Sequence, residues 1–217
     1  IPRDTKVKIK GVSVPKINHA YSAGGPEYAI NVVRSLLNVD IDYYVFGTTE
    51  IFRDVIDELG GVDYNVPINM DYDDPIQNLH IHLKKGMQHL DGAKAEQLLR
   101  FRKPNVVTNE WLQYFGGGDL KRVEIQQDFL KEVIRQKANL YTLTKINDLV
   151  NLFIDKVDTN FTVNDVLRLA RSIDKLSIDK VNTFTLPGNS GPENSDSYYF
   201  IDNEKTAELV NQYFKKD

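Results

Sequence analysis

The sequence of 217 residues contains no cysteine. A disulfide-stabilised scaffold and a thiolate nucleophile are therefore both excluded for these residues. Because proteins without cysteine occur in oxidising and reducing compartments alike, this absence does not place the protein in the cell. The fold must be stabilised by a hydrophobic core, and a chain of this length can bury one.

The sequence also lacks any uninterrupted apolar run of about 18 residues, the length that suggests a membrane-spanning helix. It does not begin with a basic segment followed by an apolar one, as a secretory signal would. Its first residue is isoleucine rather than methionine, in the stretch Ile1-Pro2-Arg3-Asp4-Thr5. We therefore expect the sequence to be a processed piece of a longer polypeptide.

An excess of positive charge is missing too, because 27 Lys and Arg residues face 31 Asp and Glu residues, for a net charge of −4. No broad positive field would attract DNA or RNA, so we expect no nucleic-acid partner. Any anion must be bound by a local cluster of basic side chains. The remaining composition, with 41% hydrophobic and 27% charged residues, is typical of an ordinary globular domain.

Apolar residues recur at helical spacing in some segments and alternate with polar residues in others. We expect helices over residues 24–37, 48–59, 91–98, 120–137, 144–153, 162–174 and 203–214. We expect strands over residues 41–46, 181–186 and 198–201, and a hairpin excursion around residues 62–83. These elements predict an α/β fold: a single α/β/α-type domain over residues 1–217, with a central mixed sheet flanked by helices.

Two arginines, Arg100 and Arg102, follow the helix predicted over residues 91–98. In an extended chain this spacing points both guanidinium groups to one side, where each can bind two oxygens of a diphosphate. The alternative is that Arg100 complements the C-terminus of the helix while Arg102 is solvated.

The helix predicted over residues 120–137 has a polar face over its first turns. Asp119, Arg122 and Gln126 are spaced three and four residues apart, and the face then becomes apolar at Phe129 and Leu130. Arginine and glutamine at the start of a core-facing stripe cost desolvation energy unless a ligand or neighbour pairs with them. Asp119 is also a natural N-cap with Arg122 as its neighbour, and this role is compatible with a binding site.

His80 and His82 lie two apart, on one face of a predicted strand, and could bind a metal ion. No third ligand is close to them in the sequence except His89, so we interpret the segment as a surface strand. Asp71, Asp73 and Asp74 lack the glycine and the final glutamate of an EF-hand loop, which indicates a solvated turn.

Seven blocks of the sequence resemble, in their order, the signature of the LytR-CpsA-Psr family. They are Ile1-Pro2-Arg3-Asp4-Thr5, Lys16-Ile17-Asn18-His19-Ala20-Tyr21 with Gly24-Gly25, Ile41-Asp42-Tyr43-Tyr44-Val45, Leu59-Gly60-Gly61-Val62, Leu90-Asp91-Gly92, Arg100-x-Arg102, and Asp119-x-x-Arg122-x-x-x-Gln126-Gln127. The later Leu186-Pro187-Gly188 and Tyr198 fit as well. The resemblance therefore extends over most of the chain.

The resemblance implies an enzyme of the bacterial cell envelope. Such an enzyme would transfer a glycopolymer, for example teichoic acid or capsular polysaccharide, from a polyprenyl pyrophosphate carrier to peptidoglycan. It implies Mg²⁺ as cofactor, a single N-terminal membrane anchor in the full-length protein, and action on the outer face of the cytoplasmic membrane. Residues 1–217 would form the catalytic domain without its N-terminal part.

By the same motif matching, several residues of this sequence would form the active site. The resemblance assigns catalytic roles to Arg3, Asp4, Arg100, Arg102, Asp119 and Arg122. Pyrophosphate binding falls to Arg3, Arg100, Arg102, Arg122 and Gln126, and an apolar tunnel for the lipid would be lined by Val123, Phe129 and Leu130.

The sequence departs from the family pattern at two points. Ile125 stands where the family usually has an arginine, and we expect this change to affect a surface or supporting contact. The carboxylates that would hold Mg²⁺ lie upstream of residue 1 in the family, so the metal ligands within this chain are unknown. An alternative function is a polyprenyl-pyrophosphate-binding or regulatory envelope protein that does not catalyse transfer. Transcriptional regulation is a third alternative, which we favour less than transfer or carrier binding.

Overall fold

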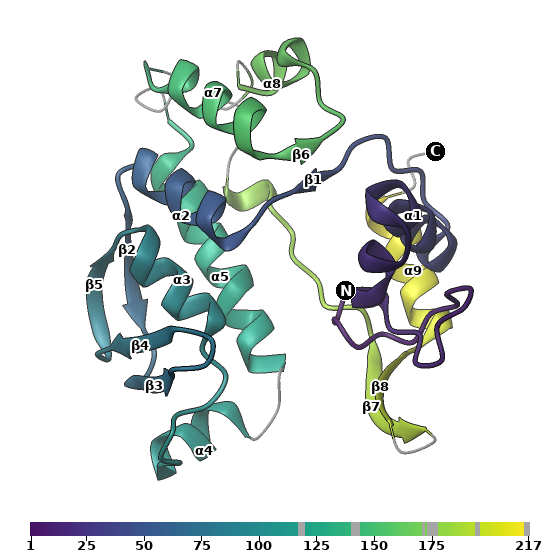
Figure 1. Ribbon diagram of the computed structural model, residues 1–217, viewed down its shortest axis with the longest axis horizontal. Coiled ribbons are helices and arrows are strands. Elements are labelled where there is room, and N and C mark those ends of the chain that lie inside the picture. The colour runs from purple at the N-terminus through teal and green to yellow at the C-terminus, as the bar shows by residue number, and fades with distance from the viewer. Residues whose placement is uncertain (117–119, 140–143, 171, 173–177, 194–195, 215–217) are drawn as a thin grey trace. The chain divides into compact units, whose positions relative to one another are not determined.

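The computed structural model describes residues 1–116, 120–139, 144–170, 172, 178–193 and 196–214. The chain folds as two compact units (Figure 1). The terminal unit comprises Ile1–Phe46 and Phe184–Asp217, and the central unit comprises Gly47–Thr183. The expectation of one catalytic domain over residues 1–217 stays a prediction.

The central unit begins with helix α2 (Thr49–Glu58). The Thr48 side chain caps this helix by accepting a hydrogen bond from the amide of Ile51 at 3.5 Å, as the sequence predicts. Gly60 and Gly61 follow the helix with φ values of 75° and 65°. Glycine adopts this left-handed conformation without strain, so the pair ends the helix.

Four strands follow α2 as a long double hairpin. They are β2 (Val62–Val66), β3 (Met70–Asp74), β4 (Leu79–Leu83) and β5 (Gly86–Leu90). β2 pairs with β5 and β3 pairs with β4, both antiparallel. Buried and exposed residues alternate along β2 and β4, so one face packs on the core and the other meets solvent. The predicted hairpin around residues 62–83 is confirmed and extends to Leu90.

The rest of the central unit is mainly helical. Its elements are α3 (Gly92–Arg100), α4 (Asn109–Phe115), α5 (Leu120–Lys137), α7 (Ile146–Lys156), α8 (Val163–Ala170), the short strand β6 (Asp158–Thr159) and the 3-10 turn η3 (Ile178–Lys180). We expected a polar loop where α4 lies. The Thr108 hydroxyl accepts a hydrogen bond from the Trp111 amide at 3.2 Å, and Gly116 ends the helix with φ 58°. These capping signals are readable in the sequence, but seven residues are too few to show helical periodicity.

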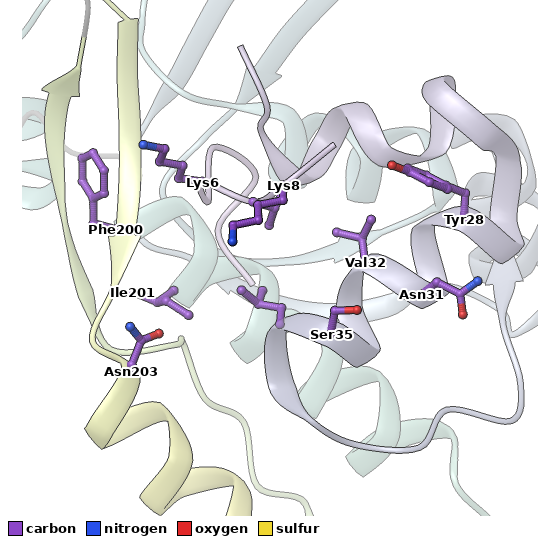
Figure 2. Close-up of a pocket in the computed structure, with 11 residues that line it drawn as sticks. Lys6, Lys8, Tyr28, Asn31, Val32, Ser35, Phe200, Ile201 and Asn203 are labelled. Carbon is purple, nitrogen blue, oxygen red and sulfur yellow. The ribbon is translucent and has the colours of Figure 1, made fainter. Parts of the chain in front are cut away.

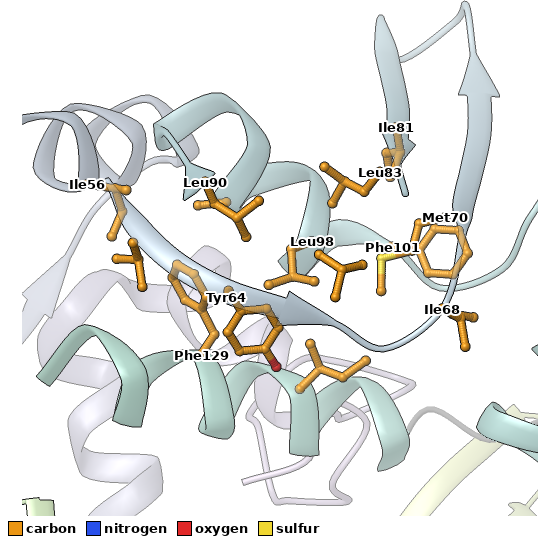
Figure 3. Packing of buried hydrophobic residues seen from close by; sticks show 14 of the residues in the cluster. Ile56, Tyr64, Ile68, Met70, Ile81, Leu83, Leu90, Leu98, Phe101 and Phe129 are labelled. Carbon is orange, nitrogen blue, oxygen red and sulfur yellow. The ribbon is translucent and has the colours of Figure 1, made fainter. Parts of the chain in front are cut away.

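The hydrophobic core of the central unit lies between the double hairpin and helices α3 and α5 (Figure 3). Tyr64 of β2 and Phe129 of α5 meet edge to face, with ring centroids 5.5 Å apart. Leu98 of α3 and Phe101 just beyond it are also buried in this cluster. The core therefore fixes α3 and α5 relative to each other, together with the polar residues on their outer faces.

Gly92 marks the closest approach of α3 to α2. A Cβ atom at this position would lie 2.3 Å from the carbonyl oxygen of Arg53. Because the obstacle is the backbone of a packed helix, Gly92→Ala is expected to lower the free energy of unfolding by about 1–3 kcal/mol. Urea denaturation measures this change. Gly47→Ala is the matched control, since its Cβ would meet Ile51 at ordinary contact distance, and equal effects of the two substitutions would contradict the close approach.

In the terminal unit, a 3-10 turn η1 (Ile17–His19) leads into helix α1 (Ala20–Leu37). The helix is kinked at Gly24 and Gly25, which have non-helical backbone angles. Pro26 then begins the longer helical segment, in agreement with the helix opening that the sequence predicts.

The terminal unit also contains a β-hairpin followed by a helix. These are β7 (Gly188–Glu193), β8 (Asp196–Ile201) and α9 (Asn203–Tyr213), with β7 and β8 antiparallel. The N-terminal segment lies parallel to β8 at Thr5, where Lys6 donates its amide to the Tyr199 carbonyl and Tyr199 donates to Asp4, both at 2.9 Å. The backbone around Arg3 and Asp4 is therefore held against β8.

The predicted mixed α/β class is confirmed, but the sheets are smaller than the central mixed sheet we expected. Among the described residues, the pairs β2–β5, β3–β4 and β7–β8 each form a two-stranded sheet. The strand predicted over residues 41–46 shortens to β1 (Val45–Phe46), and residues 181–186 form none. The side chains of Val45 and Phe46 are exposed. An apolar run shows that a segment can form a strand, but it does not show which partner would pair with that strand.

Candidate functional site

The C-terminus of α3 presents two of the predicted arginines. Phe101 lies between Arg100 and Arg102 and is buried in the core at 1% exposure. Phe101 has already left the helix, with φ −61° and ψ 128°. The buried phenylalanine thus anchors the turn from helix to extended chain, and the arginine on each side of it is half-buried or exposed.

Arg100 is held by an acidic residue that the sequence reading missed. Its Nη1 donates to Glu96 Oε1 at 2.9 Å, and the other Glu96 oxygen lies 3.4 Å from Nε of Arg53 on α2. The Glu96 side chain is 12% exposed. The signal was available, because Glu96 and Arg100 stand four apart on one helix face. Arg100 does complement a helix C-terminus, as the alternative reading held, and the same contacts fix its orientation.

Hydrogen bonds to the backbone restrain the segment from Arg102 to Asn105 at both of its ends. The Arg102 carbonyl accepts a hydrogen bond from Nε1 of Trp111 on α4 at 3.2 Å. Three residues later, the Asn105 amide donates to the carbonyl of Asp71 on β3 at 3.2 Å. Arg102 itself is exposed, so its backbone is restrained while its side chain faces solvent.

Helix α5 joins this region through Gln126. Its Nε2 donates to the carbonyl of Leu99 at 3.1 Å, one residue before Arg100. Arg122 lies one turn earlier on the same face of α5, about 6 Å along the helix axis. The contact therefore places the start of α5 beside the end of α3, as expected for Arg100, Arg122 and Gln126 in one site. Asp119 lies outside the described residues.

The first turns of α5 carry a further cation. Lys121 pairs with Glu124, and its Nζ lies 5.1 Å from the ring centroid of Tyr114. The hydrogen bond with Glu124 raises the pKa of Lys121 above its ordinary value, so the ammonium stays charged at neutral pH. Lys121 therefore adds a cation to the start of α5, balanced by Glu124.

Arg3 and Asp4 belong to the terminal unit. Asp4 Oδ1 lies 3.7 Å from Nε of Arg3 and 3.4 Å from Nζ of Lys16. Thr5 beside them is fully buried and donates its hydroxyl to the Pro2 carbonyl at 2.6 Å. Asp4 thus pairs with Arg3 and also with Lys16, a partner that we did not foresee. This pair belongs to the terminal unit, whereas Arg100, Arg102 and Arg122 belong to the central unit.

The terminal unit also contains a pocket of about 760 Å³ (Figure 2). Its walls come from the N-terminal segment, α1 and the end of β8, and combine apolar with basic and amide groups. The lining residues include Lys6, Lys8, Tyr28, Val32, Phe200 and Ile201. A pocket with apolar walls and two lysines suits an amphiphile with an anionic head.

The three residues proposed for a lipid tunnel differ in their surroundings. Phe129 is packed in the core, Val123 is half-buried and Leu130 is 51% exposed. No pocket described within either unit is lined by them, and their role as a tunnel stays a prediction. Ile125 is 2% exposed in the same core as Phe129. Its position is therefore a packing position in this chain, so of the surface or supporting contact that we expected, the surface alternative is wrong.

The one cluster of three metal-ligating side chains among the described residues does not suit Mg²⁺. This ion prefers oxygen ligands in octahedral geometry. Among the described residues, the one group of three metal-ligating side chains is Asp73, His80 and His82, which offers two imidazoles and one carboxylate. Glu96, the carboxylate beside Arg100, is already bound to two arginines. We therefore assign no step of the chemistry to the metal.

Comparison with known proteins identifies the family of this chain. The LytR_cpsA_psr family matches residues 1–215. Polyisoprenyl-teichoic acid–peptidoglycan teichoic acid transferase TagV of Bacillus subtilis is 31% identical over 217 residues, which cover 97% of this chain and 52% of TagV. The corresponding transferase TagU of Bacillus licheniformis is also 31% identical, over 97% of this chain and 63% of TagU.

Solved structures give the same result for the fold. The crystal structure of B. subtilis TagV matches 98% of this chain and 80% of the TagV chain, with a TM-score of 0.76 and 29% identity. B. subtilis TagU matches with a TM-score of 0.66 and 28% identity, over the whole of this chain and 84% of the TagU chain. The chain spans between half and two thirds of the length of its curated relatives. With a family match over nearly all of its residues, the chain belongs to the LytR-CpsA-Psr family.

Proposed function

We propose that this protein transfers a glycopolymer, of the teichoic acid or capsular polysaccharide type, from a polyprenyl pyrophosphate carrier to peptidoglycan. The observation that carries the proposal is the contact between Gln126 and the Leu99 carbonyl, which sets the α5 face that carries Arg122 and Gln126 against the end of α3, where Arg100 lies. The printed names of the relatives, teichoic acid transferases acting on peptidoglycan, support the same substrates.

The reaction is a phosphoryl transfer. A hydroxyl oxygen of peptidoglycan attacks the phosphorus next to the sugar, and a new P–O bond forms. The bond between that phosphorus and the bridging oxygen breaks, and polyprenyl phosphate leaves with the electron pair, while the hydroxyl proton passes to solvent. Such reactions need little covalent participation by the protein, so positioning and charge stabilisation supply the catalysis.

The arginines match these two tasks. The side chain of Arg100 is oriented by Glu96, which favours a fixed grip on one phosphate. Arg102 is exposed on a restrained backbone and can bind the second phosphate in a bidentate manner. As negative charge develops on the leaving phosphate, these guanidinium groups and that of Arg122 stabilise it.

The lipid of the carrier needs an apolar surface. We propose that the pocket in the terminal unit accepts isoprene units, because Val32, Phe200 and Ile201 form apolar parts of its wall. Lys6 and Lys8 on the same wall suit a phosphate at its mouth. Arg3 and Asp4 stand only two to five residues before these lysines.

The remaining parts of the proposal are Mg²⁺ as cofactor, action on the outer face of the bacterial cytoplasmic membrane, and a single-pass N-terminal anchor. Peptidoglycan as acceptor supports the location. Within the described ranges, no helix has the length and apolar character to cross a membrane. Mg²⁺ is tested below together with turnover.

The deciding experiment incubates the full-length protein with a polyprenyl-pyrophosphate-linked glycopolymer and peptidoglycan, with and without Mg²⁺. We expect release of polyprenyl phosphate and glycopolymer covalently bound to peptidoglycan, both dependent on Mg²⁺. Tight binding of the donor without release would instead establish the alternative, a binding or regulatory protein that does not catalyse transfer.

A further inference from the structure

The solvent-facing side of the β3–β4 hairpin carries two carboxylates directly opposite two imidazoles. In the antiparallel register Asp71 faces His82 and Asp73 faces His80. All four side chains are exposed, whereas their neighbours Met70, Leu79, Ile81 and Leu83 are buried. We call these four side chains the Asp/His patch. Within it, Asp73 is the third ligand that the sequence around His80 and His82 did not reveal.

The distances within the Asp/His patch are those of a metal site. One ligand atom each from Asp73, His80 and His82 lies within 4.8 Å of the others. Nε2 of His82 and Oδ1 of Asp73 are 3.4 Å apart. Two ligand atoms at about 2.0–2.1 Å from a tetrahedral metal ion are separated by about 3.3–3.4 Å, so an ion fits between them with little movement.

Asp71 orients the second imidazole. Its Oδ1 lies 2.7 Å from Nδ1 of His82, which leaves Nε2 directed at Asp73. A carboxylate on the distal nitrogen of a ligating histidine is the usual supporting contact in metal sites, because it fixes the tautomer and the ring orientation. The same hydrogen bond raises the pKa of His82, and the hydrogen bond from His80 lowers the pKa of Asp73.

The backbone beneath the Asp/His patch is held in place from both edges. Asn105 accepts a hydrogen bond from the Asp73 amide at 2.5 Å and donates to the Asp73 carbonyl at 3.1 Å. On the other strand, the His82 amide donates to the side chain of Gln97 on α3 at 2.9 Å. The ligands therefore stand on a rigid support, which lowers the entropic cost of assembling them around an ion.

We propose that the Asp/His patch binds a divalent transition-metal ion of the class that imidazole prefers, with Zn²⁺ as the test ion. Asp73 and His82 are the ligands already in position. His80, whose Nδ1 lies 2.5 Å from Asp73 Oδ1, becomes the third ligand when it exchanges this hydrogen bond for the metal, and Asp71 supports His82. The bound ion clamps β3 to β4. The site is separate from the arginines and does not depend on the proposed transferase activity.

The chain contains its own control for this site. His89 of β5 faces Asp63 of β2 in the same kind of cross-strand pair, with Nδ1 and Oδ1 2.8 Å apart. A metal site needs more than one such pair, so His89 should contribute nothing. The comparison separates chelation by the patch from weak binding to any exposed histidine next to an aspartate.

The test is calorimetric titration of the untagged full-length protein with ZnCl₂, beside the double variant H80Q/H82Q and the control H89Q. We expect one saturable site, retained in H89Q and weakened at least tenfold in H80Q/H82Q, and no saturation with MgCl₂ at the same concentrations. Zn²⁺ should also raise the thermal midpoint of the parent protein and of H89Q but not of H80Q/H82Q. Unsaturable binding in the parent, or equal Zn²⁺ affinity in H80Q/H82Q, would overturn the proposal.

Discussion

Replacing Arg102 with alanine is expected to reduce kcat/KM for glycopolymer transfer on the order of 100- to 1,000-fold, the range found when a preorganised donor to a developing charge is removed. Arg102 is exposed and its backbone is held by Trp111 and by the Asn105 contact. The substitution therefore removes a phosphate ligand without leaving a cavity. The thermal midpoint should stay nearly unchanged, since surface substitutions alter stability by no more than about 0.5 kcal/mol.

Two further variants sharpen this prediction. Arg102→Lys keeps the charge but loses the planar pair of donors, so we expect partial activity. Arg135→Ala, at the far end of α5, removes an exposed arginine paired with Glu132 and should leave transfer intact. Unchanged transfer by Arg102→Ala and by Arg122→Ala would refute the assignment of the site.

Phe129→Ala is expected to lower the free energy of unfolding by about 3–5 kcal/mol, the usual cost of truncating a buried phenylalanine. Its ring packs between Tyr64 and Phe52, with centroid distances of 5.5 Å and 6.3 Å. Truncation leaves a cavity between β2 and α5 that neighbouring elements fill only partly. Guanidinium denaturation followed by circular dichroism measures the loss.

Leu130→Ala is the matched control, because Leu130 follows Phe129 on the same helix but is 51% exposed. We expect its free energy of unfolding to change by less than about 0.5 kcal/mol. A similar loss in both variants would show that the core does not depend on the α5 face that packs against β2. If Leu130→Ala instead weakens binding of the lipid carrier, the exposed side of α5 contacts the lipid.

Most helices were predictable because their signals are local. Thr48, Asp91 and the glycines at 60 and 61 mark helix ends through hydrogen bonds and backbone angles that involve only nearby residues. The grouping of Arg122 with Gln126 needed only helical periodicity. The family resemblance suggested that both lie in one site with Arg100, and the structure shows a contact of Gln126 with Leu99, the residue before Arg100.

The interactions that could not be predicted join residues distant in sequence. Lys16 reaches Asp4, and Arg53 reaches Glu96, only because separate segments pack together. The small size of the sheets could not be predicted either, because a strand's own residues do not specify which other strand will pair with it. For the same reason the sequence did not indicate Asp73 as a partner of His80. The two residues are seven positions apart on either side of a turn, and only the strand register places them opposite each other.

The hydrogen bonds between Asn105 and β3 lower the entropic cost of binding a ligand at Arg102. The chain from Leu99 to Asn105 is tied at its start by Gln126 and at its end by the backbone of Asp71 and Asp73. Fixing a flexible backbone costs about 1–2 kcal/mol of conformational entropy per residue. In this segment that cost is met when the protein folds, so we expect ligand binding at Arg102 to order little further backbone.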